Sequence, residues 1–419
     1  MKHVPIAILG GGIAGLGAAL RAKELGLAAT VFEAGASAGG LLDNFVIDGF
    51  RFDNAVHLSF ATEPEVRRIF DRTPYFTHPA DSQCFDNGVW LKHPVQNNLF
   101  PLPAQRKVDL IKSFLDRPEA IDPANYEQWL LSQYGEGIAR AYPIAYTYKY
   151  WDTPPDQLSV NWIGNRMRRA ELDEILFGAF TAETPNTYYT KEMRYPKEGG
   201  YKAFIAPLID EAEIELNARA VKVDPIAKEI EFLGGVTVSY DRLVSTLPLP
   251  ELVRMMSDVP LEVSTAAAKL EATSIDLISV GFKVPLDLDL WFYIYDEDIY
   301  ASRAYSPSVK SPANAPAGCS SLQFEVYQRG RDPRYSAQEL KDNVCQAIQT
   351  MGIAKQEDIL FLHHKRLPWG NVIFDIGMED NRQIVRDHLD ALQVASCGRF
   401  GEWDYLWSNQ SFLSGYRAI

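Results

Sequence analysis

Three glycines near the start of the chain have the spacing that a bound dinucleotide requires. Gly10, Gly12 and Gly15 follow the pattern Gly-x-Gly-x-x-Gly, and the acid Glu33 comes after them. The first glycine permits a tight turn, the second lets backbone N–H groups approach a pyrophosphate, and the third lets a helix pack closely on a strand. The acid can accept hydrogen bonds from the adenosine ribose. The spacing therefore predicts dinucleotide binding.

This chemistry needs a strand before the glycines and a helix after them. Residues 6–9 form an apolar run typical of a buried parallel strand, and the Ala- and Leu-rich stretch 14–25 favours a helix. Gly26 can end that helix, and residues 28–32 form a second strand that leads into Glu33. The helix N-terminus adds partial positive charge under the phosphates. The agreement of these elements favours a ligand site over a glycine-rich turn that binds nothing.

A second glycine pair decides which dinucleotide is expected. Gly39 and Gly40 follow soon after Glu33. FAD enzymes of the glutathione-reductase type often carry such a pair, where the backbone packs under the flavin side of the pyrophosphate, and simple NAD dehydrogenases usually lack it. FAD is therefore the predicted cofactor. The residues predicted to bind it in this region are Gly10, Gly12, Ile13, Ala14, Gly15, Glu33, Ala34, Gly39, Gly40 and Leu41.

The composition excludes several classes of protein. The chain has 419 residues, of which 47% are hydrophobic and 23% charged, which excludes disordered, collagenous and coiled-coil proteins. A net charge of −14 disfavours nucleic acid and anionic membranes as partners. The four cysteines have no CxxC spacing, so neither a disulfide framework nor a metal site is expected. No apolar run predicts a membrane span or a signal peptide, and we expect a cytoplasmic protein.

Two segments resemble one flavoprotein family. Residues 44–59 resemble the flavin amine oxidase and protoporphyrinogen oxidase superfamily, and within it the UDP-galactopyranose mutases. The second segment, residues 395–411, resembles the end of the mutases, where Gly-Arg-x-Gly-x-Tyr-x-Tyr-Leu-Asp-Met-Asp-Gln is the pattern. Trp407 and Asn409 replace the two aspartates of that pattern. The matching residues are Gly398, Arg399, Gly401, Tyr405, Leu406 and Gln410.

The resemblance implies roles for residues near the flavin. His57 would lie close to the flavin, although a histidine in an alternating apolar stretch is as often part of a core. Arg399 would lie beside the isoalloxazine, and a helix beginning near Asn409 would direct N–H groups at the flavin pyrimidine. His57, Arg399 and Tyr405 are the predicted catalytic residues. The remaining predicted cofactor contacts are Val221 and Thr246 on two strands, then Gly398, Gln410 and Ser411.

A substrate site is implied by aromatic and basic residues. Tyr146, Lys149 and Trp151 match the mutase pattern Arg-Pro-Tyr-Thr-x-Lys-x-Trp, but Ile144 and Ala145 replace its Arg-Pro. Aromatic residues at helical spacing are also typical of a core. The arginines of segment 166–169 suit phosphate recognition, and a solvated helix face explains them nearly as well. The predicted substrate-binding residues are Tyr146, Lys149, Trp151, Arg166, Arg169, Arg303 and Tyr405.

The predicted fold class is α/β, with a glutathione-reductase-type Rossmann FAD domain, a helical insertion and a mixed β-sheet substrate domain. The FAD domain is expected from three segments, 1–75, 191–255 and 391–419. The helical substrate domain is expected over 76–190 and the β-rich substrate domain over 256–390. Within the latter, residues 306–318 are rich in Ser, Pro and Ala and predict an exposed loop.

Two flavin chemistries remain open at this stage. The resemblance implies a sugar-nucleotide mutase of polysaccharide biosynthesis, in which reduced FAD attacks the anomeric carbon through N5 and interconverts pyranose and furanose rings. It would need a nucleotide sugar and an electron donor. The strand 321–327 lacks an arginine that the mutases use for substrate phosphates, which weakens UDP-galactose as the substrate. The alternative is an FAD-dependent oxidoreductase of the amine oxidase type, whereas a flavin scaffold without turnover is disfavoured.

Overall fold

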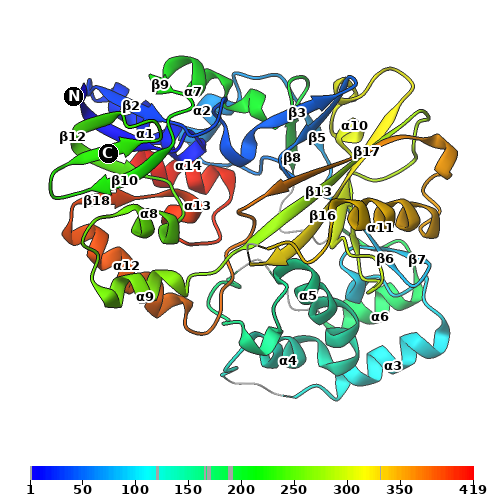
Figure 1. Ribbon diagram of the computed structural model, residues 1–419. Helices are drawn as coiled ribbons and strands as arrows, with labels where there is room; N and C mark the ends of the chain where they lie inside the picture. The colour runs from blue at the N-terminus through cyan, green and yellow to red at the C-terminus, as the bar shows by residue number, and fades with distance from the viewer. Residues whose placement is uncertain (1, 119–121, 165–166, 168–170, 187–191, 331) are drawn as a thin grey trace.

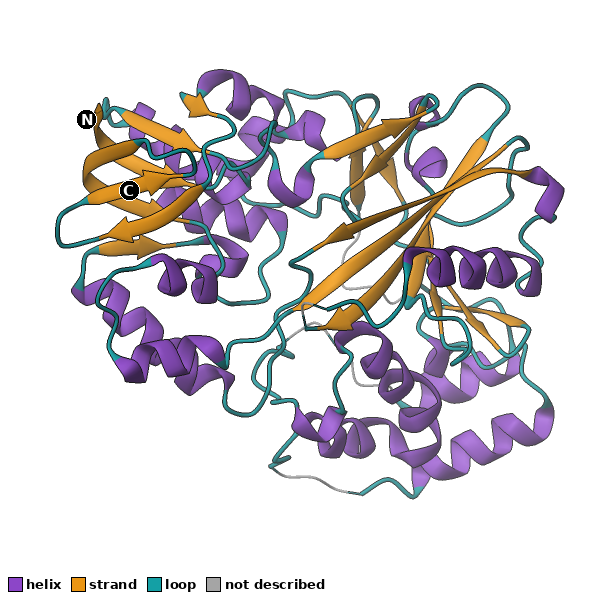
Figure 2. Ribbon diagram, in the orientation of Figure 1, coloured by secondary structure: helices purple, strands orange, loops and turns teal. Residues whose placement is uncertain are grey.

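The computed structural model describes residues 2–118, 122–164, 167, 171–186, 192–330 and 332–419. They form three parts that adjoin one another (Figure 1): a sheet flanked by helices that holds both chain ends, a second long-stranded sheet, and a group of helices. Figure 2 shows helices around the sheet of the first part, long strands in the second part and mainly helices in the third. The mixed α/β class predicted from the sequence is confirmed.

The first sheet is the Rossmann sheet. Its strand order is β10-β11-β12-β1-β2-β9, and β18 also pairs with β12. The central strands β1, β2, β12 and β18 are parallel, as expected of a sheet whose faces are covered by helices. The strands are β1 (Lys2–Leu9), β2 (Ala29–Phe32), β9 (Ile214–Glu215), β10 (Ala220–Asp224), β11 (Glu229–Phe232), β12 (Thr237–Ser245) and β18 (Val394–Ser396).

Two helices cross closely on this sheet. They are α1 (Ile13–Glu24) and the last helix, α14 (Ser408–Arg417). A side chain on Gly415 would overlap the carbonyl oxygen of Ala14, and one on Gly17 would overlap that of Phe412. Small residues therefore let the C-terminal helix lie directly beside the nucleotide-binding helix.

The second sheet forms a wall of the candidate site. Its strand order is β17-β13-β16-β15-β14-β6-β7. Helix α11 (Ala337–Thr350) packs on one face, and the other face is turned toward the segment that carries His57. The strands are β6 (Gln83–Asp86), β7 (Val89–Lys92), β13 (Thr273–Phe282), β14 (Trp291–Ile294), β15 (Arg303–Tyr305), β16 (Ser320–Arg329) and β17 (Ile359–Leu367).

The helical part brings aromatic residues to the end of the second sheet. Helix α4 (Tyr126–Ala139) runs through a π-helical turn (Arg140–Ile144) into α5 (Ala145–Trp151), which packs against β16. The other helices of this part are α3 (Ala104–Leu115) and α6 (Leu172–Phe180).

The structure divides the chain differently from the sequence prediction in three places. Strands β6 and β7, predicted within the helical segment 76–190, belong to the second sheet. Helices α9 (Leu261–Ala268) and α12 (Met378–Ala391), predicted within 256–390, pack on each other beside the Rossmann sheet. Strand β5 (Tyr75–His78) pairs with β8 (Met193–Pro196) at the first boundary.

The prediction of an exposed loop over residues 306–318 is wrong. Pro307–Lys310 form a short helix, α10, and the Lys310 side chain is fully buried. Ser311 and Asn314 are buried as well. Proline and serine marked a break in regular structure, but they carried no information on burial.

The remaining elements near the site are β3 (Asn44–Ile47), β4 (Phe50–Asp53), α2 (Pro64–Phe70), α7 (Ala206–Glu211), α8 (Leu249–Met255) and α13 (Gly398–Gly401).

Candidate functional site

The two glycine motifs lie against each other at the N-terminus of α1. Gly10 adopts a φ of +102°, which a glycine permits, and the Thr246 hydroxyl beside it donates to Leu9 O at 3.0 Å. The Gly39 N–H donates to Gly11 O at 2.9 Å, which brings the second motif beside the first. A Cβ placed on Gly12 would meet no atom within 4 Å, so the helix N-terminus opens into free space there.

This arrangement fits the pyrophosphate of a dinucleotide. Helix α1 has no acidic residue in its first turn, so no carboxylate of the helix itself offsets the positive end of its dipole. The two glycine motifs, residues 10–15 and 39–40, form what we call the cradle. Gly40 faces Gly12 across it, and a Cβ added to Gly40 would lie 3.2 Å from the Gly12 Cα. Ile13 and Ala14 open α1, and Leu41 lies in the turn after Gly40. The residues present thus leave room for phosphates and direct backbone N–H groups at them.

Glu33 is fixed at the carboxyl end of β2. Its Oε2 accepts from Gly11 N–H at 2.8 Å, and its Oε1 accepts from Gly35 N–H at 2.7 Å. Each oxygen keeps a further lone pair, so the carboxylate can still accept the predicted hydrogen bond from a ribose. Ala34 is exposed beside it, and Val221 is 39% exposed at an irregularity in the pairing of β10 with β11.

The C-terminal segment supplies the other end of the cradle. Arg399 donates from Nη2 to Asn371 Oδ1 at 2.9 Å and from Nη1 to Leu406 O at 3.2 Å. Its guanidinium carbon lies 4.8 Å from the centre of the Tyr405 ring, and its Nε is buried without a hydrogen-bond partner. This donor is therefore open to an acceptor from a ligand. Gly398, which begins α13, donates its N–H to Ser414 Oγ at 2.7 Å.

The helix expected near Asn409 begins at Ser408. Gln410 Oε1 accepts from Trp407 N–H at 2.9 Å, so Gln410 caps α14, and Ser411 N–H begins the helical bonding at 2.8 Å from Trp407 O. Ser408 Oγ shares a hydrogen bond with the Tyr201 hydroxyl at 2.8 Å. The first N–H groups of a helix have no intrahelical acceptor, so this end of α14 can receive an anionic ring.

His57 lies next to this helix terminus. Its ring centre is 5.3 Å from that of Tyr201, and its Nδ1 lies 3.1 Å from Ala55 O. Because a carbonyl oxygen only accepts, Nδ1 carries the hydrogen and Nε2 is left as an acceptor. Burial lowers the pKa of His57 to about 4, although Asp53 opposes the shift, so the ring is neutral at pH 7.

Asp53 joins three segments behind His57, and sequence reasoning missed this cluster. Its carboxylate accepts from the Tyr195 hydroxyl at 2.7 Å and from Tyr201 N–H at 2.9 Å. Lys310 Nζ lies 3.5 Å from Asp53 Oδ2, and both side chains are fully buried. Burial lowers the pKa of Lys310 to about 8, and Asp53 opposes that shift. No local pattern joins these residues, because they come from β4, from β8 and the turn after it, and from α10.

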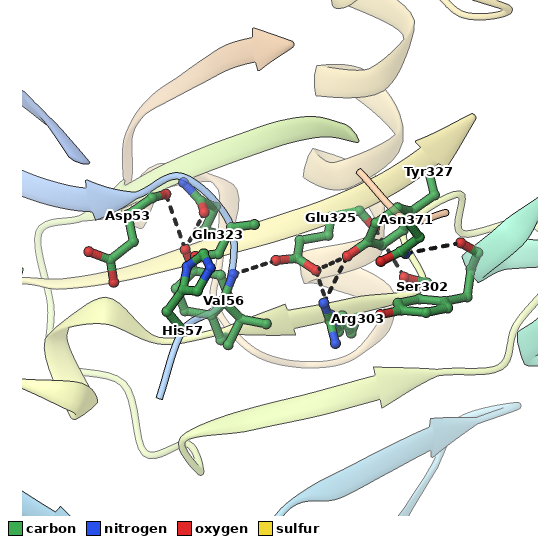
Figure 3. A network of polar contacts seen from close by, with 12 residues as sticks. Asp53, Val56, His57, Ser302, Arg303, Gln323, Glu325, Tyr327 and Asn371 are labelled. Carbon is green, nitrogen blue, oxygen red and sulfur yellow. Dashed lines mark hydrogen bonds and ion pairs between the residues drawn. The ribbon is translucent and has the colours of Figure 1, made fainter. Parts of the chain in front are cut away.

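Arg303 lies on the second sheet and is paired with Glu325, as Figure 3 shows. The Arg303 Nη2 also donates to the Tyr327 hydroxyl at 2.8 Å. Its guanidinium carbon is 5.2 Å from the centre of the Tyr150 ring. Residues 321–327 of strand β16 hold no arginine, as the sequence showed, but the strand brings a carboxylate to Arg303.

Aromatic residues of α5 join Arg303 to the C-terminal segment. The Tyr150 and Tyr405 hydroxyls share a hydrogen bond at 2.9 Å. Tyr146 stacks on Tyr150 with ring centres 5.4 Å apart, and its hydroxyl is buried without a hydrogen-bond partner. The structure therefore brings four predicted site residues to one aromatic wall: Tyr146, Arg303, Arg399 and Tyr405.

Lys149 and Trp151 are placed differently from the prediction. Lys149 Nζ lies 3.0, 2.6 and 3.2 Å from the carbonyl oxygens of Ile294, Asp296 and Ala301, which uses all three of its N–H donors. We therefore correct its role from substrate contact to support of the turn between β14 and β15. Trp151 is 5% exposed and packs at 4.7 Å against the ring of Trp162, as expected of a core residue. Arg166 and Arg169 lie outside the described residues.

The described residues hold neither a metal-binding cluster nor a membrane-spanning helix. Within them, no three His, Cys, Asp or Glu side chains gather as a metal ion would need. The same ranges hold no helix of the length and apolar character needed to cross a lipid bilayer. All four cysteines are free thiols, and Cys84 and Cys397 are buried.

Comparisons with known proteins agree with this geometry. Residues 8–73 match the family model described as an NAD(P)-binding Rossmann-like domain. Protoporphyrinogen oxidase 2 of Arabidopsis thaliana is 38% identical over 66 residues, which are 16% of this chain and only 13% of that relative's length. A crystal structure of reduced UDP-galactopyranose mutase is similar over 99% of this chain and 94% of its own, at 26% identity and a TM-score of 0.93.

Other flavin enzymes share the fold more distantly. Putrescine oxidase covers 99% of this chain and 98% of its own at a TM-score of 0.66 and 17% identity, which shows the fold alone. Fold and site together define a Rossmann-type flavoprotein. The likeness over almost the whole chain supports a place in the UDP-galactopyranose mutase-like branch of the FAD-dependent amine oxidase and protoporphyrinogen oxidase superfamily.

Proposed function

We propose that the protein is a flavin-dependent sugar-nucleotide mutase that interconverts pyranose and furanose rings. The observation that carries the proposal is the likeness to reduced UDP-galactopyranose mutase along almost the whole chain, with a TM-score of 0.93. The oxidase neighbour has the same fold at a TM-score of 0.66. The likeness to the mutase therefore extends to the helical part and the second sheet, which form the substrate side of the site.

The chain's own residues would hold FAD at two places. The glycines of the cradle and the N-terminus of α1 would bind the pyrophosphate, and Glu33 the ribose. The N-terminus of α14 would lie at the flavin pyrimidine and favour its reduced, anionic form. Reduced FAD supplies the nucleophile for the anomeric carbon of the sugar. The remaining task of the protein is to position the substrate and exclude water.

The substrate would lie along the aromatic wall. The Tyr146 hydroxyl and Arg399 Nε are buried donors without partners, so each can donate to an oxygen of the sugar or the phosphate. Arg303 is 19% exposed and can contact an anionic group while its other side faces Glu325. Tyr405, and Arg166 and Arg169 from outside the described residues, complete the proposed set for a nucleotide diphosphate.

His57 would accept a hydrogen bond or a proton at its Nε2 atom. Its neutral ring donates from Nδ1 to Ala55 O, which leaves Nε2 to accept. Its position beside Tyr201 and the start of α14 supports contact with the flavin edge. In the proposed reaction His57 therefore holds the cofactor through Nε2, and an electron donor in the cell keeps the flavin reduced.

A second function, an FAD-dependent oxidoreductase, is favoured by one observation. The cations on the described substrate side are already engaged: Arg303 with Glu325, Lys149 with carbonyl groups and Arg399 with Asn371. Tyrosine rings line the rest, and such a wall suits an apolar substrate. An oxidase would transfer hydride from that substrate to oxidised flavin.

Isomerisation separates the two functions. Reduced and oxidised protein would be incubated without oxygen with a panel of pyranose sugar nucleotides, and products separated by chromatography. A new peak of unchanged mass, formed only by the reduced protein, is the expected result. No product across the panel, combined with flavin reduction by amines or by apolar ring compounds, would support the oxidoreductase instead.

A further inference from the structure

One buried carboxylate connects the substrate side of the site to the flavin side. Glu325 Oε1 accepts from Val56 N–H at 2.7 Å, and its Oε2 is paired with Arg303 Nε (Figure 3). The Glu325 side chain is fully buried. Val56 directly precedes His57 in the chain. Glu325 thus contacts both a residue proposed for substrate binding and the backbone that carries a residue proposed for the flavin.

The strand register creates this connection. Arg303 of β15 pairs with Glu325 of β16, and Glu325 pairs with Leu277 of β13, so the three side chains share a row on one face of the sheet. Lys365 of β17 continues the row, because it pairs with Leu277. The row lies against the segment 53–57, and Lys365 Nζ donates to Asn54 Oδ1 at 2.8 Å.

Glu325 differs from the other side chains of this part that contact segment 53–57. Lys310 contacts Asp53, Lys365 contacts Asn54 and Glu325 contacts Val56. Of these three groups, Glu325 is the one that also contacts Arg303. Burial acts to raise the pKa of Glu325, but Arg303 and hydrogen bonds from Tyr327 and Val56 hold it below the ordinary value. The carboxylate is therefore charged, and its charge is shared between Arg303 and the segment.

We propose that Glu325 is a positioning residue that transmits the occupation of Arg303 by a substrate phosphate to the His57 segment, and through it to the flavin. The inference rests on the proposed function, because it takes Arg303 as a substrate contact. A phosphate on Arg303 competes with Glu325 for the guanidinium. The carboxylate then interacts more strongly with Val56 N–H and places more negative charge beside His57.

The proposal has a thermodynamic consequence. A ligand that changes the surroundings of the flavin through Glu325 must bind the oxidised and the reduced protein with different affinities, because coupling between two sites is reciprocal. UDP is a suitable probe, since it carries the diphosphate but no sugar to touch the flavin. Wild-type protein should bind UDP with two distinct values of Kd, one for each redox form.

The test compares Glu325→Gln with a matched control. Asp276 is a buried carboxylate of β13, 1% exposed, that accepts from Arg366 at 2.9 Å on the opposite face of the same sheet. Asp276→Asn therefore removes an equivalent buried, arginine-paired charge without touching segment 53–57. In ligand-free protein, E325Q should shift the flavin midpoint potential to a more positive value, because a negative charge near the reduced flavin is lost, and D276N should leave it unchanged.

The UDP titration gives the second readout. E325Q should bind UDP at least about threefold more tightly than wild type in the oxidised form, because Arg303 is no longer paired with a carboxylate. Its two values of Kd should become equal. Glu325→Asp, which keeps the charge, should recover most of the wild-type potential. This recovery distinguishes a role of the charge from a general effect on folding.

Each outcome bears either on the role of Glu325 or on the proposed function. An E325Q potential equal to that of wild type overturns the inference, as does an equal shift in D276N. Retention of the redox-dependent UDP affinity in E325Q overturns it as well. Failure of wild-type protein to bind UDP in either form contradicts a UDP-sugar as the substrate of the proposed function, not the inference, and the ligand-free potentials of E325Q, E325D and D276N then decide the inference alone.

Discussion

The hydroxyl groups of Tyr150 and Tyr405 share a hydrogen bond at 2.9 Å across a sequence separation of 255 residues. This contact joins α5 of the helical part to the loop before the last helix. Arg399 lies over the Tyr405 ring at 4.8 Å, and Arg303 lies over the Tyr150 ring at 5.2 Å. The pair of tyrosines thus links the two arginines of the site.

A double-mutant cycle measures this link. We expect Tyr150→Phe and Tyr405→Phe each to lower the free energy of unfolding, and the double variant to lose about 1 kcal/mol less than the sum, as for one buried neutral hydrogen bond. Urea denaturation of the four proteins gives the values. Strict additivity would show that the two hydroxyls do not interact in solution.

Gly12→Ala should separate cofactor binding from folding. A Cβ at Gly12 meets nothing within 4 Å, and its φ of −75° suits alanine, so the FAD-free protein should stay within about 1 kcal/mol of wild-type stability. The methyl group would occupy the space proposed for the pyrophosphate. We expect the affinity for FAD to fall at least about tenfold, measured by fluorescence titration.

Gly15→Ala provides the contrast to Gly12→Ala. A Cβ at Gly15 would overlap the Gly10 carbonyl oxygen, so this variant should lose both stability and FAD. Undiminished FAD affinity in G12A would place the pyrophosphate elsewhere.

Lys149→Met should destabilise the protein. Its ammonium serves three backbone carbonyls of the β14–β15 turn, and burial lowers its pKa to about 7 against the pull of the nearby acids. Loss of these bonds should cost about 2 kcal/mol or more in thermal or urea unfolding. Lys355→Met is the control, since that side chain is 80% exposed and should change little. Unchanged stability of K149M with a raised KM would restore the substrate role predicted from the sequence.

Stability should fall in mild acid, and His57 should account for part of the loss. Its pKa is about 6.5 when unfolded and about 4 in the folded protein. Between these values the unfolded chain binds more protons, so the free energy of unfolding rises with pH and is lost as pH falls from 6.5 toward 4. Urea unfolding from pH 7 to pH 4.5 measures the slope. His57→Asn should show a shallower slope, and an identical slope would contradict burial of the neutral ring.

The sequence predicted the strands and the helix around the first glycine motif well because the information for them is local. Gly10 to Gly15, the helix after them and the strand before Glu33 are set by neighbours in the chain, and the structure has β1, α1 and β2 there. The position of Glu33 at the end of the second strand was predicted from the same spacing. Its two bonds to Gly11 and Gly35 were not, because they depend on the turn after β2.

The substrate side could not be predicted from the sequence to the same extent. Glu325 meets Arg303 only through the register of β15 on β16, and a shift by one residue would turn the carboxylate to the other face. The partners of the Lys149 ammonium are carbonyl groups about 150 residues away in the sequence, and the partner of Lys310 is Asp53. Sequence patterns indicate a residue's type and local periodicity, but not its tertiary partner.

Breakage of the bond between the anomeric carbon and the phosphate oxygen tests the central claim most directly. The substrate for this measurement is UDP-galactopyranose with ¹⁸O in the bridging position, incubated without oxygen with the protein and followed by ³¹P NMR. The account predicts that the label moves to non-bridging positions with reduced protein and stays in place with oxidised protein. A label that stays in place with the reduced protein, although UDP-galactopyranose binds, would contradict a mutase acting on this nucleotide sugar.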